Sequence, residues 1–353
     1  MISREAVQKI LEAGAQAPSG SNSQPWRFDV RGNEIRVWAF PEKDHPILNF
    51  RHRGTWVAHG ALIENIAIAA SALGYKADIK IFPDHSKPNL TAIIGLTAST
   101  PRDEPLYHAI PRRATNRKPY KPTPLTFEEK LELLAVNQED KEDVILTEDP
   151  DDIRRLGAAM SVNEVVMLED RKLHKLFFDE IVWTEAEEKE RKSGLYLKTM
   201  ELTPPPQLAL KIFKYWPVMH FFNRLGLAEM IAKDNAKVYS AAAAYIGVIV
   251  NDSDKEFVTA GRVMERIWLT GTKLGLSVHL LTGVLFLWQR IIAEGGKGFS
   301  QKHAELVKRA YGKVASTFKV GDNKMVALLL RIGRGDPPSA KSSKKPPTVY
   351  ISD

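Results

Sequence analysis

The sequence predicts an α+β fold in which two related α/β halves share one chain, with a long apolar helix at the centre of each half. Amphipathic stretches with helical spacing alternate with short runs rich in Val and Ile along most of the 353 residues. Five residue types also recur at the same offsets in the helical stretches at about 55–73 and 258–274. Gly60, Glu64, Ile66, Leu73 and Gly74 correspond to Gly261, Glu265, Ile267, Leu274 and Gly275. Chance could produce a shared spacing, since terminal glycines are common, but five identities favour an internal duplication and hence a fused pseudo-dimer.

The first half, residues 1–100, begins with a helix from Arg4 to about Ala17, for which Ser3 is the expected N-cap. Gly32-Asn33 between two alternating runs predicts a hairpin. The remaining elements expected in this half are strands at about 26–30, 34–38, 76–82 and 90–96 and the helix at 55–73. Gly60 and Gly261 are expected to let the two long helices approach closely, and Gly74 and Gly275 to adopt left-handed caps at their ends.

Residues 101–125 are rich in Pro and Arg and predict a connector, and residues 126–335 form the second half, with Thr126 as a possible helix cap. Expected strands lie at about 143–147, 239–250 and 325–332, and expected helices at about 126–136, 151–168, 258–274 and 300–311. A helical insertion at about 171–235 is interrupted by Pro204-Pro205-Pro206. The tail, 336–353, crowds Pro, Ser and Lys into residues 336–347, where disorder is expected because a packed core is not possible.

The composition limits the classes of function. The chain has no cysteine, which excludes disulfides, thiolate metal sites and a Cys nucleophile. The histidines lack metal-ligand spacing, so no metal site is expected; the ones considered are His45, His52, His59, His108 and His279. The net charge of +7 fits a solvated basic surface or a phosphorylated ligand, and no nucleic-acid-binding signature accompanies it. No signal peptide or long apolar segment is recognisable, so a cytoplasmic location without a transmembrane segment is expected.

The segment Ala17-Pro18-Ser19-Gly20-Ser21-Asn22-Ser23-Gln24-Pro25-Trp26 follows the first helix. Pro18 ends that helix, Gly20 permits unusual dihedrals, and the short polar side chains suit a tight turn that presents amides and hydroxyls to a planar polar ligand. A connector without a ligand would use the same residue types. The whole string, however, resembles the Ala-Pro-Ser-x-x-Asn-x-Gln-Pro-Trp turn of the nitroreductase family of FMN enzymes. The resemblance implies cofactor contacts from Pro18, Ser19, Gly20, Asn22 and Gln24.

A second cluster, Arg112-Arg113-Ala114-Thr115-Asn116-Arg117, lies in the connector. Guanidinium groups with a hydroxyl between them suit a phosphate clamp, although a solvated basic loop would look the same. The family has an Arg-x-Ser/Thr-x-Arg/Lys element that holds the FMN phosphate, and the resemblance assigns this role to Arg113, Ala114, Thr115 and Arg117. In ordinary members this element precedes the Pro-Ser turn, and each flavin takes one from each subunit. A fused chain that carries one of each is therefore expected to build one FMN site, not two.

Leu281-Thr282-Gly283 follows the second long helix and by itself reads as a helix-to-loop exit. In the family the corresponding segment passes the flavin ring, with a backbone amide facing its reactive nitrogen, which implies roles for Thr282 and Gly283. The family also brings a basic residue from the C-terminal tail to the phosphate, and Lys345 is the candidate.

The resemblance implies an oxidoreductase that uses NADH or NADPH to reduce a small-molecule acceptor, such as a nitroaromatic or a quinone, by a ping-pong scheme through the flavin. No catalytic side chain is expected, because the cofactor does the chemistry. The insertion at 171–235 could be core, a lid over the flavin, or a contact to an anionic membrane surface. A lid that leaves no room for substrate would make the protein an FMN store or sensor instead.

Overall fold

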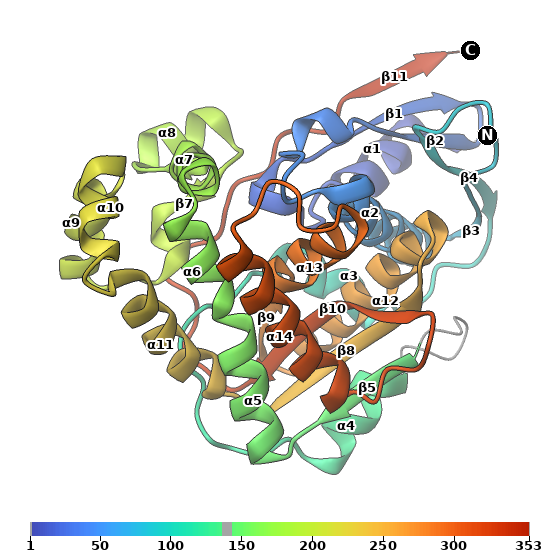
Figure 1. Cartoon of the computed structure of the whole chain (residues 1–353). Coiled ribbons are helices and arrows are strands. Elements are labelled where there is room, and N and C mark those ends of the chain that lie inside the picture. Colours follow the sequence, from blue (N-terminus) through green and yellow to red (C-terminus); the bar gives the residue numbers. More distant parts are fainter. Residues whose placement is uncertain (1, 136–142, 353) are drawn as a thin grey trace.

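The computed structural model describes residues 2–135 and 143–352, and these form two main sheets, one from each half of the sequence (Figure 1). The strands of the first sheet are β1 (Trp26–Arg31), β2 (Glu34–Ala39), β3 (Tyr75–Ile81), β4 (Leu90–Ala98) and β11 (Val349–Ser352). Those of the second sheet are β5 (Asp143–Thr147), β8 (Ala244–Asn251), β9 (Ser277–Leu281) and β10 (Lys324–Gly333). One main apolar core runs through both halves without interruption.

The strand orders of the two sheets correspond. The first sheet has the order β11-β1-β2-β4-β3 and the second β5-β8-β10-β9. All neighbours are antiparallel except β11, which joins β1 in parallel. When β11 is left aside, both sheets have the same strand order: the first, second, fourth and third strands of the sheet, counted along the chain, lie side by side. In each sheet the long helix connects the second strand to the third.

The two long helices are α2 (Arg53–Ala72) and α12 (Asp254–Lys273), and they cross at the glycines of the repeat. A Cβ atom on Gly60 would lie 2.0 Å from the carbonyl oxygen of Val258, and one on Gly261 would lie 2.1 Å from that of Val57. The close approach expected at these glycines is confirmed. The left-handed caps are confirmed as well, because Gly74 and Gly275 have φ of +82° and +72°.

The other predicted features of the first half have local causes that the structure shows. Helix α1 (Arg4–Gly14) begins at Ser3, whose hydroxyl accepts a hydrogen bond from the Ala6 amide at 3.1 Å. Its apolar residues Val7, Ile10 and Leu11 are buried, as a 3.6-residue period requires. The β1–β2 hairpin turns at Gly32, where φ is +55°.

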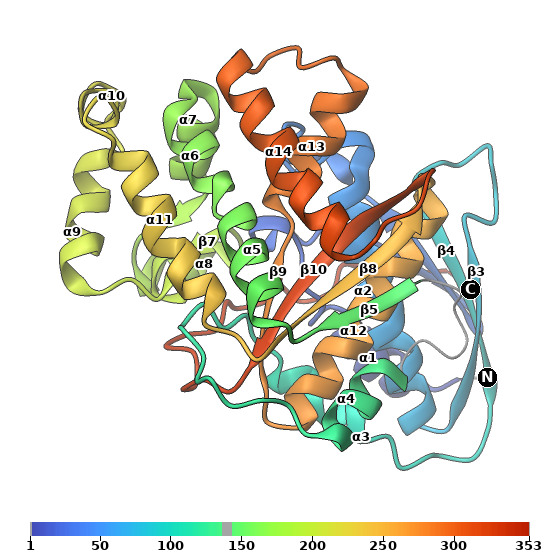
Figure 2. The same cartoon turned by 60° about the horizontal axis from the view of Figure 1, so that its bottom comes forward.

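In the second half, helices cover the sheet and line the outside of the molecule. Figure 2 shows α13 (Gly283–Ala293) and α14 (Gln301–Thr317) beside β10, with α5 (Pro150–Met160) next to α14. The shorter helices α3 (Pro105–Ala109) and α4 (Phe127–Leu134) lie near α12. Thr126 caps α4 reciprocally with Glu129, because each side chain bonds the other residue's backbone amide. The expected end of this helix at about 136 falls outside the described residues.

Six further helices form a subdomain on one side of the molecule, with α9 and α10 farthest from both sheets (Figures 1 and 2). They are α6 (Val162–Glu169), α7 (Arg171–Glu180), α8 (Glu185–Arg191), α9 (Pro204–Phe213), α10 (Trp216–Asn223) and α11 (Leu227–Ser240). The parallel pair β6 (Ile181–Val182) and β7 (Leu195–Tyr196) lies between α7 and α9. We call residues 162–240 the helical subdomain.

Three expectations about local structure were wrong. The strand expected from Tyr239 begins at Ala244, because Tyr239 and Ser240 still belong to α11. Thr282-Gly283 is not a simple helix exit, since the unpredicted β9 comes between α12 and Thr282, and Gly283 starts α13. The tail is ordered against the protein, because polar contacts and the backbone pairing of β11 replace the apolar core that its composition cannot supply.

Among the described residues, no helix combines the length and the low polarity that crossing a membrane requires.

Candidate functional site

The turn after α1 has a strained backbone. Ser21, Asn22 and Gln24 have φ of 43°, 54° and 52°, values that side chains with a Cβ seldom adopt. Gly20, expected to take the unusual dihedrals, is not among the residues with positive φ. Instead Ser19 stabilises the turn, because its hydroxyl accepts a hydrogen bond from the Gln24 amide at 3.0 Å.

The polar side chains of the turn bind two distant segments of the chain. The Asn22 amide donates to the carbonyl oxygens of Lys192 at 3.2 Å and Ser343 at 2.9 Å, and the Gln24 amide donates to Lys192 at 2.7 Å. The Gln24 side-chain oxygen accepts from the backbone amide of Lys345 at 2.8 Å. The loop after α8 and the C-terminal tail therefore cover the turn together.

A buried basic cluster lies beside this turn. Arg113 is 4% exposed, donates to the Gln16 carbonyl at 2.7 Å, and has its guanidinium 4.7 Å from the centre of the Trp268 ring. The Lys344 ammonium donates to the Ala17 carbonyl at 2.6 Å and to the Asn22 side-chain oxygen at 2.8 Å. Arg113 thus lies next to the start of the turn segment, and Lys344 contacts the turn itself.

The charges in this cluster do not balance. Burial first, and then the charges of Arg113 and Lys341, hold the pKa of Lys344 well below its ordinary value. Burial also lowers the pKa of Lys341 to about 8, with Arg113 adding to the effect. The carboxylate that opposes them is Glu265 on α12, whose Oε1 lies 3.2 Å from Arg113 Nε. Three basic groups share one opposing carboxylate in a partly dry environment, and a further anion would stabilise their charged forms.

The other residues of the connector cluster point elsewhere or remain available. The Arg117 guanidinium donates to the Thr199 carbonyl at 2.8 Å and shares no hydrogen-bond or ion-pair partner with Arg113. Ala114 and Thr115 are half-buried, and the Thr115 hydroxyl makes no hydrogen bond to any residue within the described part of the chain. The side chain of Lys345 is exposed and has no described bond to the cluster, and the tail supplies Lys344 and Lys341 instead.

Thr282 and Gly283 lie at the junction of β9 and α13. A Cβ on Gly283 would lie 2.2 Å from the side-chain oxygen of Asn163 on α6, so any larger residue there would require the Asn163 side chain to move. Thr282 is the N-cap of α13 but makes no side-chain cap, which leaves the first amides of the helix to other partners. No described hydrogen bond or ion pair links this junction to the turn or to Arg113.

A second buried network, which was not predicted from the sequence, lies next to Arg117. Arg331 on β10 is fully buried and donates to the carbonyl of Lys118 at 2.8 Å, with its guanidinium 4.0 Å from the Tyr120 ring centre. The Tyr239 hydroxyl donates to Glu164 at 2.8 Å, and burial raises the pKa of Glu164 to about 7. The one signal in the sequence is an arginine within the apolar strand 324–333, since a buried charge requires partners.

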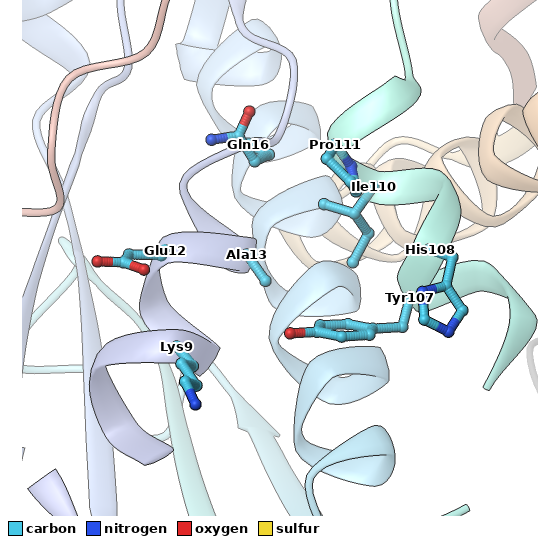
Figure 3. A pocket seen from close by; sticks show the side chains of 8 residues that line it. All are labelled: Lys9, Glu12, Ala13, Gln16, Tyr107, His108, Ile110 and Pro111. Atoms are coloured by element: carbon cyan, nitrogen blue, oxygen red, sulfur yellow. The ribbon is translucent and has the colours of Figure 1, made fainter. Parts of the chain in front are cut away.

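Two cavities lie near but outside the turn. One, of about 380 Å³, opens between α1 and the segment 107–111, and Figure 3 shows Tyr107 and Ile110 facing Ala13 across it. Gln16 and Pro111 line it, and their carbonyls accept hydrogen bonds from Arg113 and Lys341. The other, of about 230 Å³, lies around Arg53. Neither is lined by residues 17–24 or by Gly283.

Of the five histidines considered, His59 and His279 are buried and the other three are exposed. His59 is buried, its Nε2 lies 2.9 Å from the Pro25 carbonyl, and burial lowers its pKa to about 4. Burial lowers the pKa of His279 well below its ordinary value, with Arg331 and Arg117 as further causes. Within residues 2–135 and 143–352, no group of His, Cys, Asp or Glu has the arrangement of a metal site.

One family model matches the N-terminus of this chain. The model of the nitroreductase family matches residues 1–37, which include α1 and the turn. The resemblance to the nitroreductase family is thus confirmed over this segment. Its relatives in Mycobacterium tuberculosis include a protein named "Putative NAD(P)H nitroreductase", 30% identical over 118 residues, which are 33% of this chain and 34% of that protein. The chain thus matches only about a third of that relative's length.

Two longer matches come from the same organism. The protein named "Putative NAD(P)H nitroreductase acg" is 28% identical over half of this chain and 54% of its own length. An uncharacterized protein is 26% identical over 79% of this chain and 78% of its own length. Among solved structures, the match to the FMN-bound nitroreductase of Bacteroides fragilis covers 68% of this chain and 93% of that protein, at 9% identity and a TM-score of 0.36. The FMN- and NADPH-dependent nitroreductase NfnB of a Sphigopyxis strain gives 12% identity, 68% and 94% coverage, and a TM-score of 0.37.

Proposed function

We propose that the chain binds one FMN between its two halves and acts as an NAD(P)H-dependent oxidoreductase on a small acceptor such as a nitroaromatic or a quinone. The observation that carries the proposal is the convergence of Arg113, Lys341 and Lys344 on one carboxylate beside the family's turn. A phosphate would neutralise the excess charge and accept hydrogen bonds from these groups.

The residues present fit this cofactor. Arg113 Nε is buried without an aligned hydrogen-bond partner, and the Thr115 hydroxyl follows two positions later. Arg113, Lys341 and Lys344 would hold the phosphate, and Ser19, Asn22 and Gln24 would serve a polar edge of the ligand once their bonds to Lys192 and the tail open. When bound, FMN supplies two-electron redox chemistry between NAD(P)H and the acceptor. The roles of Arg117, Thr282 and Gly283 remain those implied by the family.

Duplication explains why the chain would hold one site. The helices α2 and α12 have equal lengths, pack by equivalent glycines and connect equivalent strands, which supports two fused copies. The cluster equivalent to that of Glu265 surrounds Glu64, whose oxygens lie 2.9 Å from Arg262 Nε and 2.5 Å from Arg266 Nε. There two arginines oppose Glu64, with Glu104 close enough to interact with both Glu64 and Arg266. That cluster is balanced, so it offers no comparable anion site.

Flavin titration of the purified protein tests the proposal. We expect binding at one FMN per chain, and Arg113→Ala is expected to weaken it by roughly 10- to 150-fold, since a hydrogen bond to a charged group contributes about 1.5–3 kcal/mol. Arg112→Ala is the matched control, because Arg112 is exposed and bonds only the His108 carbonyl among the described contacts. Two flavins per chain, or equal affinities in both variants, would refute the assignment.

The second candidate is an FMN store or sensor with a closed site. It is favoured by the cover that the Lys192 loop and the tail place over the turn. Adding NADPH or NADH to the FMN-loaded protein without oxygen separates the two. Prompt bleaching of the flavin band supports the reductase, whereas a stable yellow colour beside a reactive free-FMN control supports storage.

A further inference from the structure

The helical subdomain has a small apolar core of its own and a second set of apolar side chains that the core leaves out. The core gathers Phe178, Ile181, Leu197, Met219 and Ala228, with Leu210 and Phe213 packed against it. These residues account for the inward sides of α9, α10 and α11.

The outward apolar side chains are large and solvent-exposed. Leu208 and Ile212 on α9 are 63% and 56% exposed, and they lie four positions apart, so they share one face of the helix. Phe221 on α10 and Leu225 just after it repeat the spacing, with exposures of 59% and 71%. Tyr215, between the two helices, is 58% exposed. Scattered exposed apolar residues are ordinary, but a group confined to one projecting element marks a contact surface.

Within residues 202–228, the segment that carries these side chains, the Asp, Glu, Lys and Arg residues all have one sign of charge. Between Glu201 and Glu229 the sequence contains no acidic residue, but it contains Lys211, Lys214 and Arg224. All three cations are exposed, and none forms an ion pair with a residue that the structure describes. We call Leu208, Lys211, Ile212, Lys214, Tyr215, Phe221, Arg224 and Leu225 the α9–α10 patch.

We propose that the α9–α10 patch docks the protein on an anionic lipid surface. Exposed apolar and aromatic side chains among cations are what a helix needs to lie in the headgroup region, where the apolar groups enter the acyl boundary and the cations meet lipid phosphates. The break between α9 and α10 is no obstacle, because the outward pairs on both helices are already exposed.

The same charges argue against a second copy of the chain as the occupant. A symmetric dimer pairs a patch with itself, so Lys211, Lys214 and Arg224 would face the same three cations. No carboxylate within 202–228 could neutralise them. The patch lies at the outer end of the molecule, away from both sheets, so docking leaves the rest of the fold unobstructed (Figures 1 and 2).

Vesicle flotation of the full chain tests this inference independently of flavin binding. Vesicles of phosphatidylcholine with phosphatidylglycerol are expected to carry the protein upward, and vesicles of phosphatidylcholine alone are not. The triple variant Lys211→Gln, Lys214→Gln, Arg224→Gln is expected to weaken binding on the order of 100-fold, given the contribution of each cation near an anionic surface. Its control removes the same charge from α14 by Lys308→Gln, Arg309→Gln and Lys313→Gln, which should leave flotation unchanged.

A second pair of variants tests the apolar part. Leu208→Gln, Ile212→Gln and Leu225→Gln together should abolish flotation, whereas Phe127→Gln, Leu131→Gln and Ile292→Gln, which remove equally exposed residues elsewhere, should not. Unchanged thermal midpoints would show that all variants fold. Absence of flotation with anionic vesicles, or equal loss in patch and control variants, overturns the proposal. So does a dimer in sedimentation that only the patch variants dissociate, because it would assign the surface to a second copy.

Discussion

A methyl group at the crossing of α2 and α12 is expected to destabilise the protein strongly. In Gly261→Ala the new Cβ would lie 2.1 Å from the Val57 carbonyl oxygen and 2.8 Å from the carbonyl carbon. Ordinary contacts to Cβ begin above about 3 Å, so two buried backbones would have to separate by roughly 1 Å. Because Val57 contributes backbone atoms and not a flexible side chain, no rotamer change relieves the clash.

The magnitude follows from two opposed effects. Overpacking a core costs about 1–3 kcal/mol and more where the backbone must move, while alanine gains about 1 kcal/mol over glycine in helix propensity. We expect a net loss of roughly 2–4 kcal/mol. With an unfolding entropy of about 2 cal/mol/K per residue, this lowers the thermal midpoint by roughly 3–5 °C.

Gly312→Ala is the matched control. Gly312 lies within α14, and a Cβ there would meet nothing within 4 Å. Only the propensity gain applies, so the midpoint should rise by roughly 1 °C. Thermal unfolding followed by tryptophan fluorescence measures both. If Gly261→Ala were as stable as Gly312→Ala, the packing of the two helices would not be as described.

Three other perturbations test the buried charges. Burial raises the pKa of Glu164 to about 7, so the folded state favours its protonated form and the stability of the wild type falls as pH rises from about 4.5 through 7. Glu164→Gln should therefore be more stable than the wild type by up to roughly 1–3 kcal/mol at pH 8 and should differ little from it at pH 4. A pH-independent difference in thermal midpoint would contradict this. The pKa of Lys344 is depressed, so the stability of the wild type should rise toward pH 10, and Lys344→Met should be the more stable protein at neutral pH. The variant should also lose most of the stabilisation that added phosphate gives the wild type. Equal phosphate effects in both proteins would contradict an anion site at this cluster. Glu188→Ala removes the carboxylate that accepts hydrogen bonds from the Ser343 amide at 2.5 Å and the Ser343 hydroxyl at 2.9 Å. Limited proteolysis should therefore cut the tail faster than in the wild type or in Glu190→Ala, the control at an exposed site. Unchanged cleavage would show that other contacts hold the tail.

The sequence alone determined the elements that depend on local chemistry. Ser3 and Thr126 cap helices because short hydroxyl side chains satisfy free amides, and Gly74 and Gly275 end the long helices because a left-handed cap excludes most side chains. The repeat predicted the close packing at Gly60 and Gly261, since both glycines sit at the same place in equivalent helices.

Only the tertiary structure decided which distant groups meet. The choice of Lys344 over Lys345, the engagement of Asn22 by the tail, and the burial of Arg331 with Tyr120 depend on contacts between residues hundreds of positions apart. The periodicity of one segment carries no information about such partners. The strands β9 and β11 were not predicted either. β9 is short, and the tail strand β11 is stabilised by pairing with β1, more than 300 positions earlier in the chain.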